Sequence, residues 1–373
     1  MDETNITHEE KIAQQTKRLD SLVRRFETIF SFSVPVFAVL AGLAVAGLLI
    51  LGVGVSPFQA YAAMLKGAFG NAYAIGTSLN KATPLILTGM GVIIAFRGGL
   101  FNVGGEGQIC MGGFAAAVAG IYITGLPIYI HIPVAFLAAF LAGAIWSMIA
   151  GYLYSKYNVN LLITTIMMNY IATYIINIMV KGPIQEPPGY FVQSKQLLES
   201  AWLPILGQAT RLHSGIYLAL ASAIIFHIVL WNMPFGYEIR AIGENIIAAR
   251  HAGMKVMRDQ LLIMFISGGL AGLAGAVEIM GAQYRLRPNF LMNFGYDAIA
   301  VALLGQLQPL ATIISGILFG ALRAGAGTMQ RTINLPMSLV FVVQGIVIMF
   351  VVGSSILMRL PRYLAKKEAG RGN

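Results

Sequence analysis

Long runs of apolar, almost uncharged sequence constrain the fold of this chain more than any other feature. A helix needs about 20 apolar residues to cross the hydrocarbon core of a bilayer. Of the 373 residues, 57% are hydrophobic and only 11% are charged, whereas soluble domains carry about 25% charged residues. Inside lipid every backbone polar group must be satisfied within the protein, which favours helices. The sequence therefore predicts an all-α, polytopic membrane protein.

Ten segments are apolar enough to be candidate membrane helices. Segment 296–308 is short for a full crossing, and segment 84–100 carries Arg97 near its end. We therefore expect some of the helices to be broken or re-entrant. The ten segments are roughly 34–54, 84–100, 107–124, 132–153, 159–180, 214–232, 261–283, 296–308, 309–325 and 336–357.

The distribution of lysine and arginine predicts the orientation in the membrane. With the N-terminus in the cytoplasm, the inner segments hold 16 of the 25 basic residues and the outer segments hold 8. Positive charge is enriched on the cytoplasmic side, and an even number of spans places both termini there. We predict a cytoplasmic tail at 1–33, a transmembrane domain at 34–358 and a cytoplasmic tail at 359–373. The N-terminal tail includes a segment, 17–27, that is compatible with an amphipathic helix on the membrane.

Small residues recur four positions apart in several of these segments. Such spacing lets helices approach closely in lipid. We predict helix–helix contacts at Gly268 with Gly272, at Gly316 with Gly320, and at Ala139 with Gly143. In segment 159–180, the side chains of Met167, Tyr170 and Tyr174 are expected to be packing groups rather than groups that stack on a ligand.

Residues 97–113 are glycine-rich and polar, although they lie between two apolar segments. Non-helical backbone at membrane depth needs protein or a water-filled cavity around it. We therefore predict a transport pathway beside this stretch. Its candidate residues are Arg97, Asn102, Glu106 and Gln108, and Asn169 of segment 159–180 is a further candidate.

Two interpretations of these side chains remain open. An ionisable group inside a membrane segment is a candidate functional residue, but a carboxylate at the start of segment 107–124 is also stabilised by the helix dipole. For Glu106 the structural role is favoured, with Arg97 as the expected partner. Asn102 and Gln108 are equally suited to hydrogen bonds with a polar ligand and to hydrogen bonds between helices.

The inner loop 233–260 contains a second informative pattern. Pro234 and Gly236 are expected to end the preceding helix, and Gly243 is expected to separate a short strand or turn from a helix. Asn245 is placed to cap that helix and Gly253 to end it. Since isolated helices of this length are marginal, we expect it to dock into a groove of another protein or to lie on the bilayer.

Several functions are disfavoured by what the sequence lacks. There is no phosphate-binding Gly-x-x-x-x-Gly-Lys-Ser/Thr loop, so any ATPase must be a separate chain. Cys110 and the five scattered histidines show no metal-ligand spacing, and no hydrolytic motif lies in the spans. A transporter that works alone would need a relay of paired ionisable groups, whereas the charges in the spans are isolated: Arg97, Glu106, Glu278 and Arg323.

Three sequence patches, in order, resemble one family. The run 99–108 (GLFNVGGEGQ) resembles the signature of permease subunits of ABC importers in the branched-chain amino acid and simple-sugar class, and more narrowly of its nucleoside-uptake branch. Residues 243–245 with 248–253 resemble the cytoplasmic coupling loop of that class. Residues 297–305, followed by Pro309 and 319–322, form the third patch.

The resemblance implies a type II-like importer permease in a bacterial cytoplasmic membrane that works by alternating access. It implies a heterodimer with a second permease, an ATP-binding subunit that carries ATP and Mg²⁺, and an external substrate-binding lipoprotein, with no cofactor in this chain. Nucleosides are the implied cargo, and a monosaccharide or a branched-chain amino acid is the alternative. The outer segments 55–83 and 181–213 would then form a docking surface or plain connectors.

The resemblance also implies roles for the inner loop. Glu244 and Arg250 are expected to make polar contacts with the ATPase, while apolar side chains fill its groove. The full set of predicted coupling residues is Gly243, Glu244, Asn245, Ile246, Ile247, Ala249, Arg250 and Gly253.

Overall fold

The computed structural model describes residues 40–290 and 292–333, together with Phe37 and six scattered positions between residues 342 and 353. The tails 1–33 and 359–373 and most of the predicted span 336–357 lie outside the described residues. The chain divides into two compact units, one of residues 55–337 and one of residues 1–54 with 338–373. The predicted domain limits of 34–358 stay a prediction.

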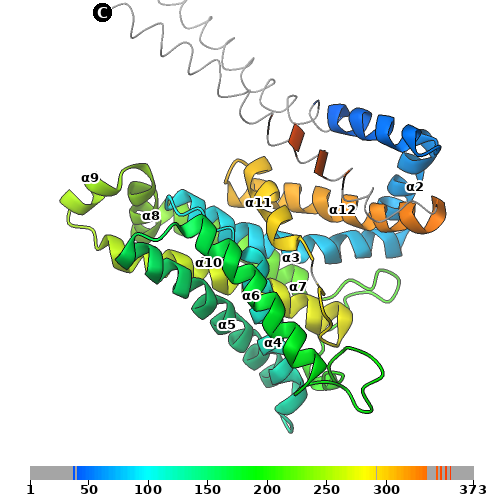
Figure 1. The fold of residues 1–373 in the computed structure, drawn as a ribbon, viewed down its shortest axis with the longest axis horizontal. Coiled ribbons are helices and arrows are strands. Elements are labelled where there is room, and N and C mark those ends of the chain that lie inside the picture. Colours follow the sequence, from blue (N-terminus) through cyan, green and yellow to red (C-terminus); the bar gives the residue numbers. More distant parts are fainter. Residues whose placement is uncertain are drawn as a thin grey trace, which may run out of the picture. The chain divides into compact units, whose positions relative to one another are not determined.

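The regular secondary structure in the described part of the larger unit is helical, apart from two isolated β-bridges. Its α-helices, labelled as in Figure 1, are α2 (Pro57–Phe69), α3 (Ala72–Arg97), α4 (Gly105–Tyr122), α5 (Ile128–Tyr157), α6 (Leu161–Lys181), α7 (Gly215–Asn232), α8 (Pro234–Glu244), α9 (Ile246–His251), α10 (Val256–Glu278), α11 (Phe294–Leu304) and α12 (Pro309–Ile333). A 3₁₀ turn, η1 (Glu199–Ala201), and a π turn, η2 (Ile279–Gln283), complete the unit.

Six of the described helices are long and apolar enough to cross a membrane, namely α3, α5, α6, α7, α12 and the continuous pair α10–η2. The number rises to seven if the helix Leu40–Gly52 and α2 form one span. This confirms a polytopic all-α membrane protein, while the count of ten is not confirmed. As expected, α11 is short, with 11 residues.

Helix α3 begins well before residue 84, where the sequence analysis placed its start. Asn71 caps it, because the side-chain oxygen of Asn71 accepts a hydrogen bond of 2.8 Å from the backbone N–H of Ala74. Lys81 therefore lies within a spanning helix and not in an outer loop. Its charge is balanced by Glu278 of α10, whose carboxylate is 3.1 Å from the Lys81 ammonium, and this partner is remote in the sequence.

Helix α10 is central to the packing and contacts α5, α4 and α3. The predicted small-residue contacts are confirmed here. A side chain at Gly272 would overlap the carbonyl oxygen of Ala139, and one at Gly143 would overlap the carbonyl oxygen of Gly268. In the same way Gly320 of α12 packs on the backbone of α3 at Ser78. Backbones that approach this closely hold the helices together by van der Waals contact.

The two ends of the α5–α10 bundle carry different connections (Figure 1). Helices α8 and α9 lie at one end, where α10 begins. The long connection 182–214 lies at the other end and is joined to the segment after α10. There, Ser194 and Leu286 exchange backbone and side-chain hydrogen bonds of 2.9 Å.

Candidate functional site

Glu106 caps a helix that lies far away in the sequence. Its two carboxylate oxygens accept hydrogen bonds from the backbone N–H groups of Asn293, at 2.7 Å, and Gly295, at 2.8 Å. These groups belong to the start of α11, where the first N–H groups have no partner within the helix. Gly295 allows this approach, since a Cβ there would overlap the backbone nitrogen of Glu106. Glu106 thus joins the beginnings of α4 and α11.

The predicted pair of Arg97 and Glu106 is wrong. Arg97 ends α3 and reaches the turn between α11 and α12, where it donates to the carbonyl oxygens of Leu307, at 3.2 Å, and Gln306, at 3.4 Å. Carbonyl groups at the end of a helix attract cations. The physical reason is that the end of α3 directs Arg97 to the turn after α11, whereas Glu106 faces the start of that helix.

Asn102 and Gln108 face each other in the interior. The amide of Asn102 donates to the Gln108 side chain at 3.3 Å and to the Ser267 hydroxyl at 3.0 Å, and Gln108 donates back to Asn102 at 3.1 Å. The Asn102 oxygen also accepts from the N–H of Gly104 at 2.9 Å. Both side chains are buried. This geometry favours hydrogen bonding between segments over contact with a ligand.

Asn169 extends the same network to α6. Its oxygen accepts from the N–H of Gly107 at 2.8 Å, and its amide donates to the carbonyl of Val103 at 3.0 Å and to the hydroxyl of Tyr296 at 3.2 Å. The structure therefore brings the predicted residues Asn102, Glu106, Gln108 and Asn169 together around the stretch 102–108. It places Arg97 apart from them.

Two partly buried ion pairs were missed from the sequence. Lys81 pairs with Glu278, and Arg323 pairs with Asp297 at 2.7 Å. Both cations lie over the ring of Phe294 at the start of α11, with Lys81 at 5.7 Å and Arg323 at 3.9 Å from its centroid. A charge inside a membrane protein is costly unless it is paired. This rule predicts from the sequence that each of these charges has a partner, but it does not identify the partner.

The strand or turn that was expected before Gly243 is wrong, because residues 234–244 form helix α8. Pro234 occupies the first helical position of α8, where proline loses no hydrogen bond and its fixed φ suits the helix. It therefore starts a new helix after α7. Asn245 then caps α9 as predicted, because its side-chain oxygen accepts from the N–H groups of Ile247 and Ala248 at 3.0 Å each. Gly253 has a φ of +86° and follows the end of α9.

The exposed surface of α9 differs in one respect from the prediction. Ile247 is 66% exposed and Ile246 is 36% exposed, so both are available to a partner. Ala249 is only 3% exposed and packs with Ile242 and Val256. Because Ala249 anchors α9 to this chain, its predicted place in a groove of the ATPase is wrong.

Helix α8 is in direct backbone contact with the end of α3. A Cβ added to Gly243 would overlap the carbonyl oxygen of Arg97 and come within 3.1 Å of the nitrogen of Gly99. Gly99 has a φ of +73°, and a Cβ there would lie 3.2 Å from the Cα of Gly243. Trp231, at the end of α7, lies beneath Arg97 at 5.3 Å and Arg240 of α8 at 4.8 Å. Helix α8 therefore packs directly on the backbone that leads into the polar stretch.

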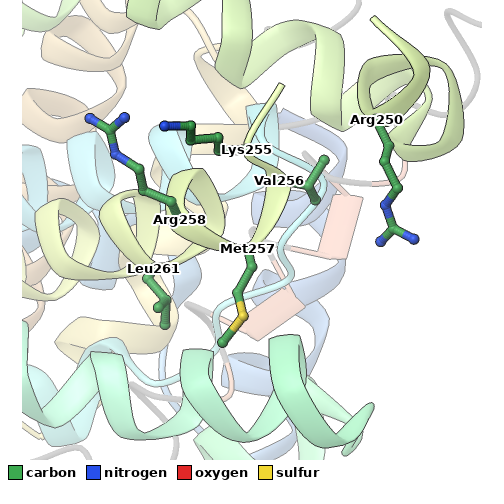
Figure 2. A pocket seen from close by; sticks show the side chains of 6 residues that line it. All are labelled: Arg250, Lys255, Val256, Met257, Arg258 and Leu261. Carbon is green, nitrogen blue, oxygen red and sulfur yellow. The ribbon is translucent and has the colours of Figure 1, made fainter. Parts of the chain in front are cut away.

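A surface cavity of about 530 Å³ lies between α9 and the first turns of α10 (Figure 2). Three cations line it, and in Figure 2 Lys255 and Arg258 point away from Arg250. Its remaining lining residues are Val256, Met257 and Leu261. This end of the molecule therefore presents positive charge next to the exposed isoleucines of α9.

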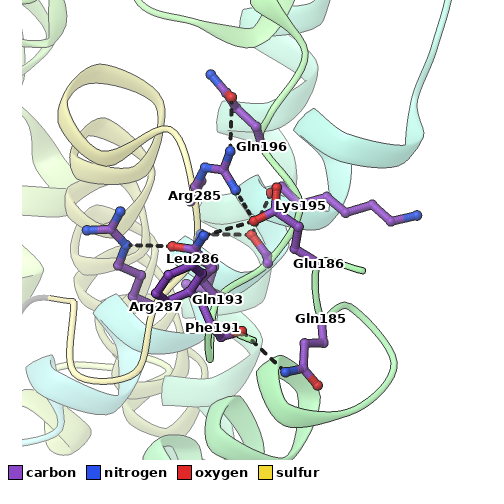
Figure 3. Close-up of polar contacts among 10 residues, drawn as sticks. Gln185, Glu186, Phe191, Gln193, Lys195, Gln196, Arg285, Leu286 and Arg287 are labelled. Atoms are coloured by element: carbon purple, nitrogen blue, oxygen red, sulfur yellow. Dashed lines mark hydrogen bonds and ion pairs between the residues drawn. The ribbon is translucent and has the colours of Figure 1, made fainter. Parts of the chain in front are cut away.

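At the opposite end, polar contacts fasten the connection 182–214 to the segment after η2 (Figure 3). Arg285 pairs with Glu186 and donates to Gln196 at 3.2 Å, while Arg287 donates to Gln193 at 3.3 Å. The hydrogen bond from Arg285 holds the pKa of Glu186 below its usual range. A carboxyl group whose pKa is lowered by folding stabilises the folded state at pH values above the ordinary pKa of glutamate. This contact therefore contributes to stability at neutral pH, and its contribution is lost in acid.

Comparison with known proteins assigns the chain to a family. The family described as branched-chain amino acid transport system / permease component matches residues 74–352. The chain belongs to this permease family. Membership confirms the predicted permease subunit, and hence a transport subunit and not an enzyme.

Similar proteins cover nearly the whole chain. The guanosine ABC transporter permease protein NupP of Bacillus subtilis is 38% identical over 340 residues, which are 90% of this chain and 97% of NupP. The glucose ABC transporter permease protein TsgB13 of Haloferax volcanii is 33% identical over 88% of this chain and 89% of TsgB13. The nucleoside ABC transporter permease protein NupB of Lactococcus lactis is 29% identical over 90% of this chain and 95% of NupB. No solved structure shows a significant match.

Proposed function

We propose that this permease imports nucleosides by alternating access, driven by ATP hydrolysis on a separate subunit. The contact of Gly243 with the backbone of Arg97 and Gly99 carries the proposal. It links the exposed helix α9 to the polar stretch 102–108, whose network joins α4, α6, α10 and α11. Movement of the ATPase would thereby reach the helices beside the pathway. In this scheme, the polar network positions those helices.

Nucleosides are the proposed cargo because two of the relatives, NupP and NupB, are named for guanosine and nucleosides. A monosaccharide is the second candidate, since TsgB13 is named for glucose. Competition experiments separate the two. Excess unlabelled guanosine should suppress uptake of radiolabelled guanosine by the assembled transporter, and glucose should leave it unchanged. Uptake of radiolabelled glucose that excess glucose, but not guanosine, suppresses would favour the sugar.

The proposed assembly contains a second permease, an ATPase with its ATP and Mg²⁺, and an external binding lipoprotein. Bacillus subtilis NupQ, which is also named a guanosine ABC transporter permease protein, is 28% identical over 66% of this chain. The two named guanosine permeases of one organism support pairing with a non-identical permease. The chain would lie in the cytoplasmic membrane with both termini in the cytoplasm.

The two ends of the bundle carry surfaces suited to the ATPase on one side and to the external binding lipoprotein on the other. The exposed Ile246 and Ile247, flanked by Glu244 and Arg250, form an apolar and charged surface for the ATPase. Arg285 and Arg287, fixed by Glu186 and Gln193, present positive charge toward the binding lipoprotein. Charged rims of this kind steer association and set orientation.

Arg250 provides a direct test of the coupling surface. Replacing Arg250 with glutamate should reduce ATP-driven uptake at least about tenfold, since like charges placed across an interface cost several kcal/mol. Arg250 is exposed, so membrane insertion and thermal stability should remain those of the parent. Uptake and ATPase co-purification are the measurements.

Arg331→Glu is the matched control, because Arg331 is exposed at the end of α12. It should keep parental uptake. Normal uptake by Arg250→Glu would exclude this arginine from the ATPase contact.

A further inference from the structure

Helix α6 exposes a stripe of aromatic and polar side chains. Its buried face, which includes Asn169 and Ala172, packs against α4 and α5. Tyr170, Thr173, Tyr174 and Asn177 follow the i, i+3, i+4, i+7 spacing that places residues on one face of a helix. Tyr170 is 57% exposed and Tyr174 is 66% exposed. The two tyrosines therefore do not pack within this chain, and the expectation that they pack rather than stack on a ligand stays a prediction.

This stripe is poorly suited to lipid. Helix α6 has 21 residues and is a candidate membrane span, and Tyr170 lies at its middle. Tyrosines of membrane helices concentrate at the two interfaces, where the hydroxyl group reaches water. A hydroxyl or amide that faces hydrocarbon has no hydrogen-bond partner and is costly. The hydroxyl of Thr173 is satisfied by the carbonyl oxygen of Asn169 at 3.0 Å, but no such partner is seen for the two tyrosine hydroxyls or the Asn177 amide among the described residues. These three groups on one face indicate a water-filled or protein-lined environment.

The polar network of the site lies on the buried side of the same helix. Asn169, on the buried side of α6, donates to the hydroxyl of Tyr296 at the start of α11. Tyr296 is itself partly exposed, so the network reaches an accessible aromatic ring at the start of α11. Ligand sites typically combine apolar and aromatic walls with a few hydrogen-bonding groups, and this composition matches.

We propose that the stripe of Tyr170, Thr173, Tyr174 and Asn177 lines the passage between this chain and the second permease, and that the tyrosine rings stack on the nucleobase in transit. The proposal rests on the proposed nucleoside import. Every base has an aromatic face, so stacking accepts purines and pyrimidines alike. Asn177 offers hydrogen bonds to the base edge or ribose. An open surface that binds the nucleoside weakly permits its release into the cytoplasm.

Cysteine labelling tests whether the stripe faces water. In the assembled transporter in proteoliposomes, with Cys110 replaced by alanine, single cysteines are introduced as Tyr174→Cys and, as the control, Ile171→Cys. Ile171 is exposed on an adjacent face of the same helix. A charged, membrane-impermeant maleimide should label Tyr174→Cys at least about tenfold faster, because the thiolate that reacts requires water. Excess guanosine should slow that labelling.

Equal labelling of the two positions would overturn the proposed passage. Faster labelling of Tyr174→Cys without protection by excess guanosine would overturn passage of the nucleoside along the stripe, whereas the base-stacking role is tested by the substitutions that keep or remove the ring. Labelling does not require transport, so it remains informative even if the parent fails to take up guanosine, an outcome that would refute the proposed cargo separately.

Substitutions at Tyr174 provide the second readout. Tyr174→Leu should raise the guanosine concentration for half-maximal uptake about tenfold, within the range of one lost base–aromatic stack. Tyr174→Phe retains the ring and should show a clearly smaller rise, whereas Ile171→Leu should behave as the parent. Equal effects of Leu and Phe at residue 174 would contradict stacking.

Discussion

Replacing Gly243 with valine should abolish ATP-driven uptake. The new side chain would overlap the carbonyl oxygen of Arg97, and two packed backbones cannot both remain in place. Overpacking of this kind typically costs about 1–3 kcal/mol, so we expect the protein to fold with α8 displaced from α3. Uptake should fall by more than about tenfold. Transport assays in proteoliposomes that contain all partners provide the measurement.

The matched control for Gly243→Val is Gly327→Val. A Cβ at Gly327, within α12, would meet no atom of the described residues within 4 Å. This control should insert and transport like the parent. If Gly243→Val transported at the parental rate, the contact between α8 and α3 would have no part in coupling.

Replacing Glu106 with alanine should destabilise the larger unit. Two backbone N–H groups at the start of α11 would lose their acceptor. Hydrogen bonds to a charged group contribute about 1.5–3 kcal/mol each, and Glu106 is only partly buried, so we expect the lower end, about 3 kcal/mol in total. Thermal unfolding of the detergent-solubilised transporter should then begin several degrees lower.

Glu106→Gln separates the capping role from a charge-dependent role in transport. Glutamine keeps one acceptor oxygen and should lose about half as much stability as alanine. If both variants unfolded like the parent while uptake was lost, Glu106 would act on the substrate and not as a cap.

The sequence was sufficient for features that depend on local pattern. Gly268, Gly272 and Gly143 could be predicted at helix contacts because small residues four apart form a flat surface on any helix. Asn245 could be recognised as a cap because the acceptor and the N–H groups lie within three residues. Both features arise within one turn of helix.

The sequence was insufficient where the partner lies far along the chain. Lys81 looked like a loop residue because its partner, Glu278, lies on another helix. Glu106 was paired with the nearest cation, whereas its real partners are N–H groups at 293 and 295. Pro234 was ambiguous because proline both ends one helix and begins the next.

The central claim is that this permease works in an ATP-driven nucleoside importer. The most direct test is uptake of radiolabelled guanosine into proteoliposomes that hold this chain with its co-purifying partners, with and without ATP and the binding lipoprotein. We predict uptake that requires both and that excess unlabelled nucleoside, but not ribose or glucose, suppresses. Guanosine uptake by this chain alone in the absence of ATP would contradict the account.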